Sequence, residues 1–295
     1  SVQVLPLATG TAANSITLGS LSPPWGAVFC HPNAHINNDE GGAPEFYTDG
    51  AKLTLIDGDN AKISAGALDR TIRQAGAHGV HNVKPAVVSI TQATECGTAY
   101  TPSEIEAISK VTRQHHLPLH MDGARFSNAL AYLGCQPADI TWRAGIDVLS
   151  YGGTKNGAMD AEAIIVFGDH PDWIEGMHRR RKRGGHLLSK MRYVSAQLLA
   201  LIDNNLATEL AGCANEKAQR LAQGLEATGK VSLKWPVEAN EVFIEAEDTL
   251  LTALKENGIH FHRWPGYAGV ARLVCTFETS DEQVDTFIDY VKRLG

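Results

Sequence analysis

Short apolar runs alternate along most of the chain with longer stretches whose apolar residues recur at helical spacing. The runs predict strands at residues 2–7, 27–30, 52–57, 86–91, 117–121, 146–150 and 163–167. The stretches between them predict helices, among them 12–21, 64–75, 102–114 and 126–133. Strands that alternate with helices are typical of an α/β fold with a mostly parallel sheet.

The pattern changes beyond residue 173. Residues 173–228 are helix-rich and predict a bridge between two lobes. The remainder alternates short strands with two helices, which indicates a compact α+β unit. We therefore predict a large domain at residues 1–205 and a small C-terminal domain at 206–295. Because a strand begins at the second residue, we also expect further residues upstream of Ser1.

Composition narrows the class of protein. The 295 residues are 43% hydrophobic and 20% charged, which is typical of a globular protein with a sizeable core. A net charge of -7 argues against a nucleic-acid partner, and we interpret the basic run 179–183 as a solvated helix face. No apolar run approaches the roughly 20 residues of a membrane span. Five scattered cysteines without a CxxC pair predict neither disulfides nor a metal site, and favour a reducing cytoplasm.

Two predicted strands are followed by side chains that can take part in catalysis or cofactor binding. Asp122 follows the strand at 117–121, and Lys155 follows the strand at 146–150. Since ligands gather at the carboxyl ends of strands in such sheets, both residues fall on one rim. A carboxylate and a lysine there suit pyridoxal phosphate, which needs a partner for its ring nitrogen and a Schiff-base amine. Taken alone, Asp122 is explained nearly as well by helix capping.

Two further segments point to the same rim. Gly10 and Thr11 lie between the first strand and its helix, where free backbone N–H groups can bind a phosphate. An ordinary strand-to-helix turn also explains them. The polar, glycine-rich segment 31–45 predicts a functional loop that contains His35. Its imidazole can stack on a ring or move a proton, or simply make a hydrogen bond.

The motifs LHMDGARFSNA at 119–129 and SYGGTKNG at 150–157 are similar to those of the threonine aldolases. These form part of the β-eliminating lyase group of aspartate-aminotransferase-like, fold type I pyridoxal phosphate enzymes. The resemblance covers the whole chain, and QATE at 92–95 resembles the low-specificity threonine or phenylserine aldolase branch. It implies an α/β fold with a mostly parallel, seven-stranded sheet in the large domain and a small C-terminal α+β domain.

The resemblance also implies a role for each site residue. Lys155 would form the Schiff base with pyridoxal phosphate, and Asp122 would pair with its ring nitrogen. Ala124 and His35 would lie on opposite faces of the ring. The phosphate would be bound by Gly10, Thr11 and Thr154.

Three arginines complete the implied site. Arg125 and Arg272 would hold the carboxylate of an amino-acid substrate, a task that suits the bidentate guanidinium. Arg192 would reach the cofactor phosphate of a neighbouring subunit, so a homodimer or homotetramer is expected. Two departures stand out. Thr94 occupies a position where the other branch has histidine, and an N-terminal segment with a carboxylate-binding serine is missing.

These features predict a retro-aldol cleavage of β-hydroxy-α-amino acids, such as threonine, allo-threonine and phenylserine, to glycine and an aldehyde. His35 is the first candidate for the base that accepts the hydroxyl proton. An aminotransferase or β-eliminating lyase of the same fold is the main alternative, because fold alone does not select the chemistry. A non-catalytic relative that only binds the cofactor is another. A nucleotide-binding oxidoreductase is disfavoured, since no GxGxxG follows the first strand.

Overall fold

The computed structural model describes residues 1–295 and contains two sheets. The larger has seven strands in the order β1-β7-β6-β5-β4-β2-β3. Neighbours from β6 to β3 pair in parallel, whereas β7 and β1 are antiparallel to the strands beside them. This confirms the mostly parallel sheet. The strands are β1 (Val2–Leu7), β2 (Gly26–Cys30), β3 (Lys52–Leu55), β4 (Lys84–Thr91), β5 (Leu119–Gly123), β6 (Val148–Gly152) and β7 (Glu162–Phe167).

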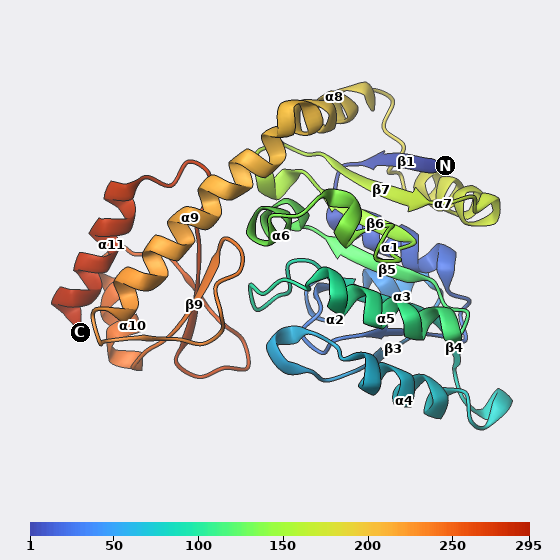
Figure 1. Ribbon diagram of the computed structural model, residues 1–295, viewed down its shortest axis with the longest axis horizontal. Helices are drawn as coiled ribbons and strands as arrows, with labels where there is room; N and C mark the ends of the chain where they lie inside the picture. The colour runs from blue at the N-terminus through green and yellow to red at the C-terminus, as the bar shows by residue number, and fades with distance from the viewer.

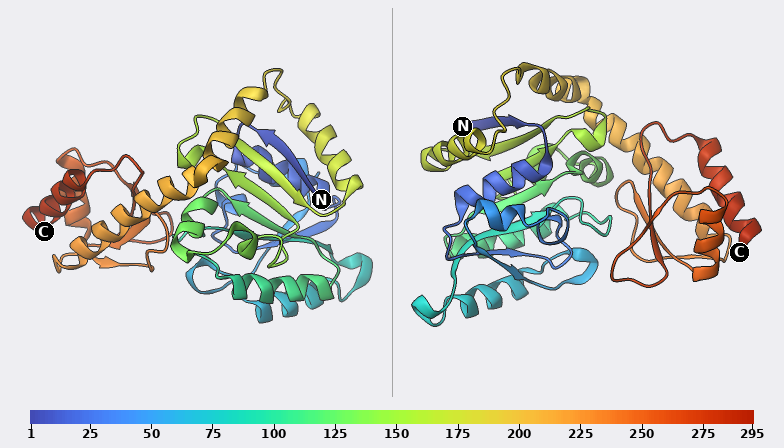
Figure 2. Two further views of the ribbon diagram at one scale, coloured as in Figure 1. Left: turned by 45° about the horizontal axis from the view of Figure 1, so that its top comes forward. Right: turned by 180° about the vertical axis from the view of Figure 1, so that it is seen from behind.

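Helices cover both faces of this sheet, and neighbouring strand residues contact opposite layers. Val148 packs in the cluster formed with α1 and α7, while Leu149 packs in the main cluster with α4, α5 and α6. Figure 2 shows α1 against the rear face in its right view. The helices of this domain are α1 (Gly10–Leu21), α4 (Ala65–Ala75), α5 (Pro102–Gln114), α6 (Phe126–Leu133), α7 (Pro171–Arg183) and α8 (Arg192–Ile202).

The C-terminal part forms a second core around a four-stranded antiparallel sheet in the order β10-β11-β9-β8. The long helix α9 (Leu206–Glu226) packs on α6 and continues into this second core, so it connects the two parts (Figure 1). The other elements are β8 (Ser232–Leu233), β9 (Glu241–Glu245), β10 (His262–Arg263), β11 (Val270–Val274), α10 (Asp248–Glu256) and α11 (Asp281–Leu294).

Two expectations need correction. The segment 31–45 is not a simple loop, because it contains α2 (His35–Asn38) and the start of α3 (Ala43–Tyr47). Pro44 occupies the first turn of α3, where its missing N–H costs no hydrogen bond. The basic run at the end of α7 is not wholly solvated, because Arg181 is only 6% exposed. No helix combines the length and the apolar character needed to cross a membrane.

Candidate active site

A cavity of about 300 Å³ opens at the carboxyl ends of β5 and β6 and beside the N-terminus of α1. It collects all the predicted site residues except the three arginines: Gly10, Thr11, His35, Asp122, Ala124, Thr154 and Lys155 line it. Residues far apart in the sequence thus meet because three strand-to-helix connections end on one rim. The wall also contains residues that the sequence did not single out: Ala8, Thr9, Asn14, Glu40, Asp160 and Glu162.

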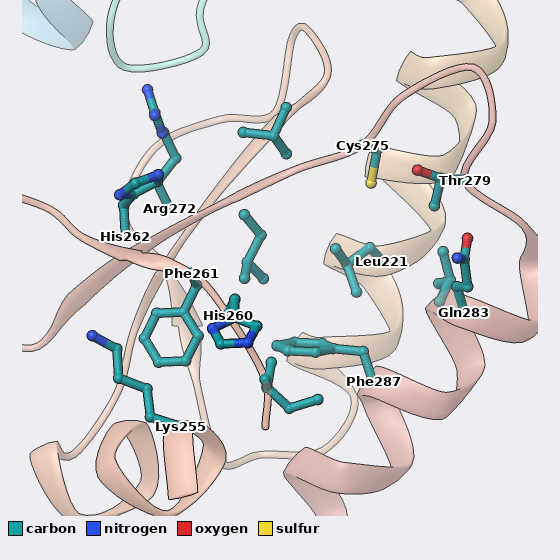
Figure 3. Close-up of a pocket in the computed structure, with 14 residues that line it drawn as sticks. Leu221, Lys255, His260, Phe261, His262, Arg272, Cys275, Thr279, Gln283 and Phe287 are labelled. Atoms are coloured by element: carbon teal, nitrogen blue, oxygen red, sulfur yellow. The ribbon is translucent and has the colours of Figure 1, made fainter. Parts of the chain in front are cut away.

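A larger cavity, of about 750 Å³, lies in the C-terminal part between α9, α10, α11 and the edge of the small sheet (Figure 3). Its lining is mainly apolar, with Phe261, Leu221 and Phe287 among the residues labelled in the picture. It contains no carboxylate, and Arg272 is its only predicted site residue. Size alone would favour this cavity, but the convergent polar groups favour the smaller one.

Asp122 lines the smaller cavity and is only 3% exposed. Its Oδ1 accepts the Ala124 N–H at 3.0 Å, and its Oδ2 accepts Asn14 Nδ2 at 2.9 Å. The following residue must be glycine, because a Cβ on Gly123 would lie 2.6 Å from a methyl of Leu149. The carboxylate is therefore buried and held in one orientation by two hydrogen-bond donors. A buried charge needs such partners, and this one can also face a positively charged group.

Lys155 lies in the 3₁₀ turn Thr154–Asn156 that directly follows β6 and is exposed. Gly152 lets this turn approach the loop after β5, because a Cβ there would lie 2.7 Å from the Cα of Ala124. Asn156 anchors the turn by donating Nδ2 to the Ala207 carbonyl in α9 at 2.7 Å. The close contact with Ala124 explains how the lysine and Asp122 come to share one cavity.

The N-terminus of α1 provides backbone donors to the same cavity. Thr9 caps the helix by accepting the Ala12 N–H at 3.2 Å, and Gly10 leaves open space, since a Cβ there would meet only Glu162 Oε2 at 3.8 Å. Glu162 accepts the Thr154 N–H at 3.3 Å. Burial raises the pKa of this carboxyl to about 7, so it is poised between its neutral and charged forms.

His35 is held by a polar network that reaches Asp122. Its Nδ1 lies 3.0 Å from Glu40 Oε1, and the same oxygen accepts Asn14 Nδ2 at 2.8 Å. Asn14 thus donates to Glu40 and Asp122 at once. Burial raises the pKa of Glu40, and the hydrogen bond to Glu40 raises the pKa of His35.

The three side chains of this network resemble a metal-ligand set, because ligand atoms of His35, Glu40 and Asp122 all lie within 4.8 Å of one another. However, the Asn14 amide already bridges the two carboxylates with its N–H groups. Because the neutral amide of Asn14 donates hydrogen bonds to both acids, the two carboxylates are held together without a metal ion. We therefore interpret Asn14 and Glu40 as the residues that orient Asp122 and His35.

Comparison with known proteins identifies the family. The family model described as "Beta-eliminating lyase" matches residues 2–249. The low-specificity L-threonine aldolase of Pseudomonas aeruginosa is 42% identical over 276 residues, which cover 93% of this chain and 78% of that protein. This chain belongs to the β-eliminating lyase family. The threonine aldolase of Pseudomonas sp. is likewise 42% identical over 275 residues.

Solved structures confirm the fold type I prediction for this member of the β-eliminating lyase family. Leishmania major threonine aldolase superimposes with a TM-score of 0.91 and 30% identity, covering 100% of this chain and 84% of that one. Tryptophan decarboxylase of Catharanthus roseus, at 14% identity and a TM-score of 0.76, covers 99% of this chain and 69% of its own, and shares the fold alone. The family depends on pyridoxal phosphate.

The predicted carboxylate-binding arginines meet beside the cavity and do not line it. Arg125 Nη2 lies 2.9 Å from Glu241 Oε1, and Arg272 Nη1 lies 3.4 Å from the same oxygen. Glu241 is 1% exposed, and the Nε atoms of both arginines have no partner. Arg192 is exposed at the start of α8, where its guanidinium lies over the ring of Tyr193, away from this cavity.

The sequence reasoning did not single out five buried polar residues around these groups: Asn14, Glu40, Glu95, Glu162 and Glu241. Each is nine-tenths buried or more. Part of the signal was visible, because Glu40 and Glu95 stand in the segments AHINNDEGGAPEF and QATE, and Glu241 opens a predicted strand. A polar residue inside an otherwise apolar pattern is the feature that could have revealed them.

Proposed function

We propose that this protein is a pyridoxal phosphate-dependent aldolase that cleaves β-hydroxy-α-amino acids to glycine and an aldehyde. Membership in the β-eliminating lyase family and the 42% identity to low-specificity L-threonine aldolases support this function. The observation at the site that best supports this function is that a buried, oriented Asp122 and Lys155 line the same cavity. Threonine, allo-threonine and phenylserine are the proposed substrates.

Two features of the cavity support cofactor binding. Asp122 has two protein donors and faces the cavity, so it can accept the N–H of a protonated ring nitrogen. Gly10 leaves room at the N-terminus of α1, where backbone donors favour a phosphate. We assign Lys155 as the Schiff-base lysine, Gly10, Thr11 and Thr154 to the phosphate, and Ala124 to one face of the ring.

Bound there, the cofactor supplies an electron sink for the carbon–carbon bond that breaks. The protein's task is to orient the substrate. We propose that Arg125 and Arg272 bind its carboxylate, with Glu241 holding the two guanidinium groups in register. A fixed carboxylate and a fixed amino group together set the direction of the Cα–Cβ bond, which is an entropic gain.

His35 is proposed to stack on the ring face opposite Ala124. Glu40 fixes its Nδ1 and thereby the orientation of the imidazole. A role as base would need a free acceptor at Nε2. The raised pKa of His35 favours the imidazolium, which has no acceptor, so its second predicted role fits less well than its first.

The assay for the proposed function is direct. Purified protein with pyridoxal phosphate is incubated separately with threonine, allo-threonine and phenylserine, and glycine and aldehyde are quantified. Stoichiometric glycine and aldehyde are expected. Release of ammonia and a keto acid would instead indicate a β-eliminating lyase or an aminotransferase. Cofactor binding without any turnover would indicate a non-catalytic relative.

Cofactor affinity is expected to depend on pH through Glu162. The pKa of about 7 means that Glu162 becomes charged beside the bound phosphate as the pH rises, which weakens binding by up to about tenfold per pH unit. Glu162→Gln should bind pyridoxal phosphate more tightly than the wild type above neutral pH and should lose this slope. Spectroscopic titration across neutral pH measures both, with the exposed Glu175→Gln as control. Parallel slopes in all three proteins would contradict the assignment.

Arg125→Lys is expected to raise KM more than it lowers kcat. Lysine keeps the charge but loses the planar fork, and one charge-assisted hydrogen bond is worth roughly 1.5–3 kcal/mol, or about 10- to 100-fold in KM. Steady-state kinetics with phenylserine separate the two parameters. Arg143→Lys, at an exposed arginine bound to Asp139, serves as control. An unchanged KM would remove Arg125 from the carboxylate site.

We also propose that the chain forms a homodimer or homotetramer in which Arg192 reaches a neighbour's cofactor phosphate. Arg192 is exposed, and Leu199 and Ile202 on the same helix are 66% and 64% exposed. Light scattering on the purified protein tests the assembly. A stable monomer at micromolar concentration would contradict it.

A further inference from the structure

Glu95 is a buried carboxyl without a partner. It lies in the loop that follows β4, is 7% exposed, and makes no hydrogen bond or ion pair. The loop itself is firmly held, because the side chain of Gln92 exchanges two hydrogen bonds with the backbone of Tyr100, at 2.9 and 2.8 Å. An acid that its own rigid loop leaves unpaired, next to the site of Asp122, points to a use in function.

Charged groups from four other elements face Glu95. They are Glu241 on β9, Arg125 before α6, His35 on α2 and Lys155 after β6. Burial, followed by the charge of Glu241, raises the pKa of the Glu95 carboxyl, and the three cations oppose this shift. The backbone of the loop touches the site at two points: the Gln92 N–H donates to the Asp122 carbonyl at 2.7 Å, and a Cβ on Gly97 would lie 3.2 Å from the Glu241 carbonyl. Glu95, between these two residues of the loop, therefore lies between the proposed carboxylate anchor and the proposed amino anchor of the substrate.

This position defines what Glu95 faces when a substrate is bound. The substrate's amino group is directed to Lys155 and its carboxylate to Arg125 and Arg272, so its β-carbon lies beside the line between these anchors. Building on the proposed function, we propose that Glu95 is the catalytic residue that accepts the proton of the β-hydroxyl group.

The step balances as follows. The β O–H bond breaks and an O–H bond to the Glu95 carboxylate forms. The electron pair of the broken bond becomes the second bond of the aldehyde carbonyl, the Cα–Cβ bond breaks, and its pair stays with the glycine fragment. One proton is then added to Cα. That proton comes from solvent, and Glu95 releases the hydroxyl proton to solvent, so Glu95 is again a carboxylate after each cycle.

The other groups nearby are less suited to this transfer. His35 is hydrogen-bonded to Glu40 at Nδ1 and favours its protonated form. The hydroxyl of Thr94 is already bonded to the Asn60 carbonyl at 3.2 Å and to Thr98 Oγ1 at 2.8 Å. No side chain or backbone group of the protein occupies either carboxylate oxygen of Glu95, so these oxygens can accept the hydroxyl proton.

The test distinguishes transfer of the β-hydroxyl proton from the other steps of the reaction. Holoenzyme of Glu95→Gln, Glu95→Asp and the wild type is compared in two assays: phenylserine cleavage, and solvent-deuterium exchange of the α-proton of glycine followed by NMR. Glycine needs the same cofactor and arginines but has no β-hydroxyl. The exposed Glu106→Gln on α5 is the control.

For Glu95→Gln we expect kcat for cleavage to fall about 10²- to 10⁴-fold, the range for loss of a general base, while glycine exchange and cofactor absorbance stay within about threefold of the wild type. Glu95→Asp should recover part of the cleavage activity. Unchanged cleavage, or an equal fall of cleavage and exchange, would overturn the role of Glu95. A wild-type holoenzyme that exchanges glycine but cleaves none of the substrates would instead overturn the proposed function, and this inference with it.

Discussion

Lys155→Ala is expected to abolish the visible absorbance of the protein-bound cofactor and to lower the rate of aldehyde formation by about 10⁴-fold or more. Lys155 is the only lysine in the wall of the 300 Å³ cavity, and alanine leaves no amine there to form the Schiff base. The turn that carries it should persist, because Asn156 and Thr154 hold it through hydrogen bonds to α9 and to Glu162. The measurement is the absorbance spectrum of dialysed holoprotein together with the phenylserine assay.

Two controls make this result specific. Lys190→Ala removes an exposed lysine outside the cavity and should leave both readouts unchanged. Thermal unfolding of the apoproteins should show Lys155→Ala close to the wild type, because the side chain is exposed and makes no ion pair or hydrogen bond. If Lys155→Ala keeps the absorbance of the wild type after dialysis, another lysine forms the Schiff base and the assignment is wrong.

Much of the architecture was predictable because strands and helices of this fold leave strong local patterns. The run at 146–150 is mainly apolar, as a strand covered on both faces must be, and the structure buries Val148 and Leu149 in different clusters. The helix predicted at 102–114 is α5, and the structure shows a capping box of Thr101 and Glu104 at its start. The helix predicted at 126–133 is α6, which ends at Gly134 with a left-handed C-cap.

The strand order and the antiparallel edge were not predictable in the same way. The pairing of β1 with β7 joins Leu5 to Ile164, a contact across most of the large domain that no local pattern encodes. The helices α2 and α3 were missed because they span only four and five residues and lie in a polar segment whose glycines and asparagines favour turns. Tertiary contacts determined the structure at these positions.

The same distinction applies to the candidate site. Asp122, Lys155 and the turn at Gly10 stand at strand ends, where sequence position alone predicts a shared rim. Glu241 lies over one hundred residues from Arg125 in the chain, and only the packing of the two cores reveals that it binds both arginines. Long-range ion pairs of this kind have no sequence signature, which explains why the arginines were predicted without their partner.

Asp122→Asn is expected to lower kcat by roughly 10²- to 10³-fold, an effect comparable to the removal of one key electrostatic contact. The carboxylate favours the protonated ring nitrogen, and the neutral amide cannot. Asn14 and the Ala124 N–H both donate to Asp122, so one of these two donors would face the NH₂ group of the new amide and lose its acceptor. The apoprotein should therefore also lose about 1–3 kcal/mol of stability.

Asp122→Glu separates charge from geometry. It keeps the negative charge but moves it by one methylene in a site where the Ala124 N–H and Asn14 Nδ2 fix the positions of both carboxylate oxygens. If charge at the ring nitrogen is the main contribution, Asp122→Glu should retain more activity than Asp122→Asn even when it is the less stable protein. Three measurements on both variants distinguish the contribution of charge from that of geometry: thermal unfolding, the spectrum of the bound cofactor, and kcat for phenylserine. An Asp122→Asn enzyme with full activity would show that the carboxylate serves only to cap the chain after β5.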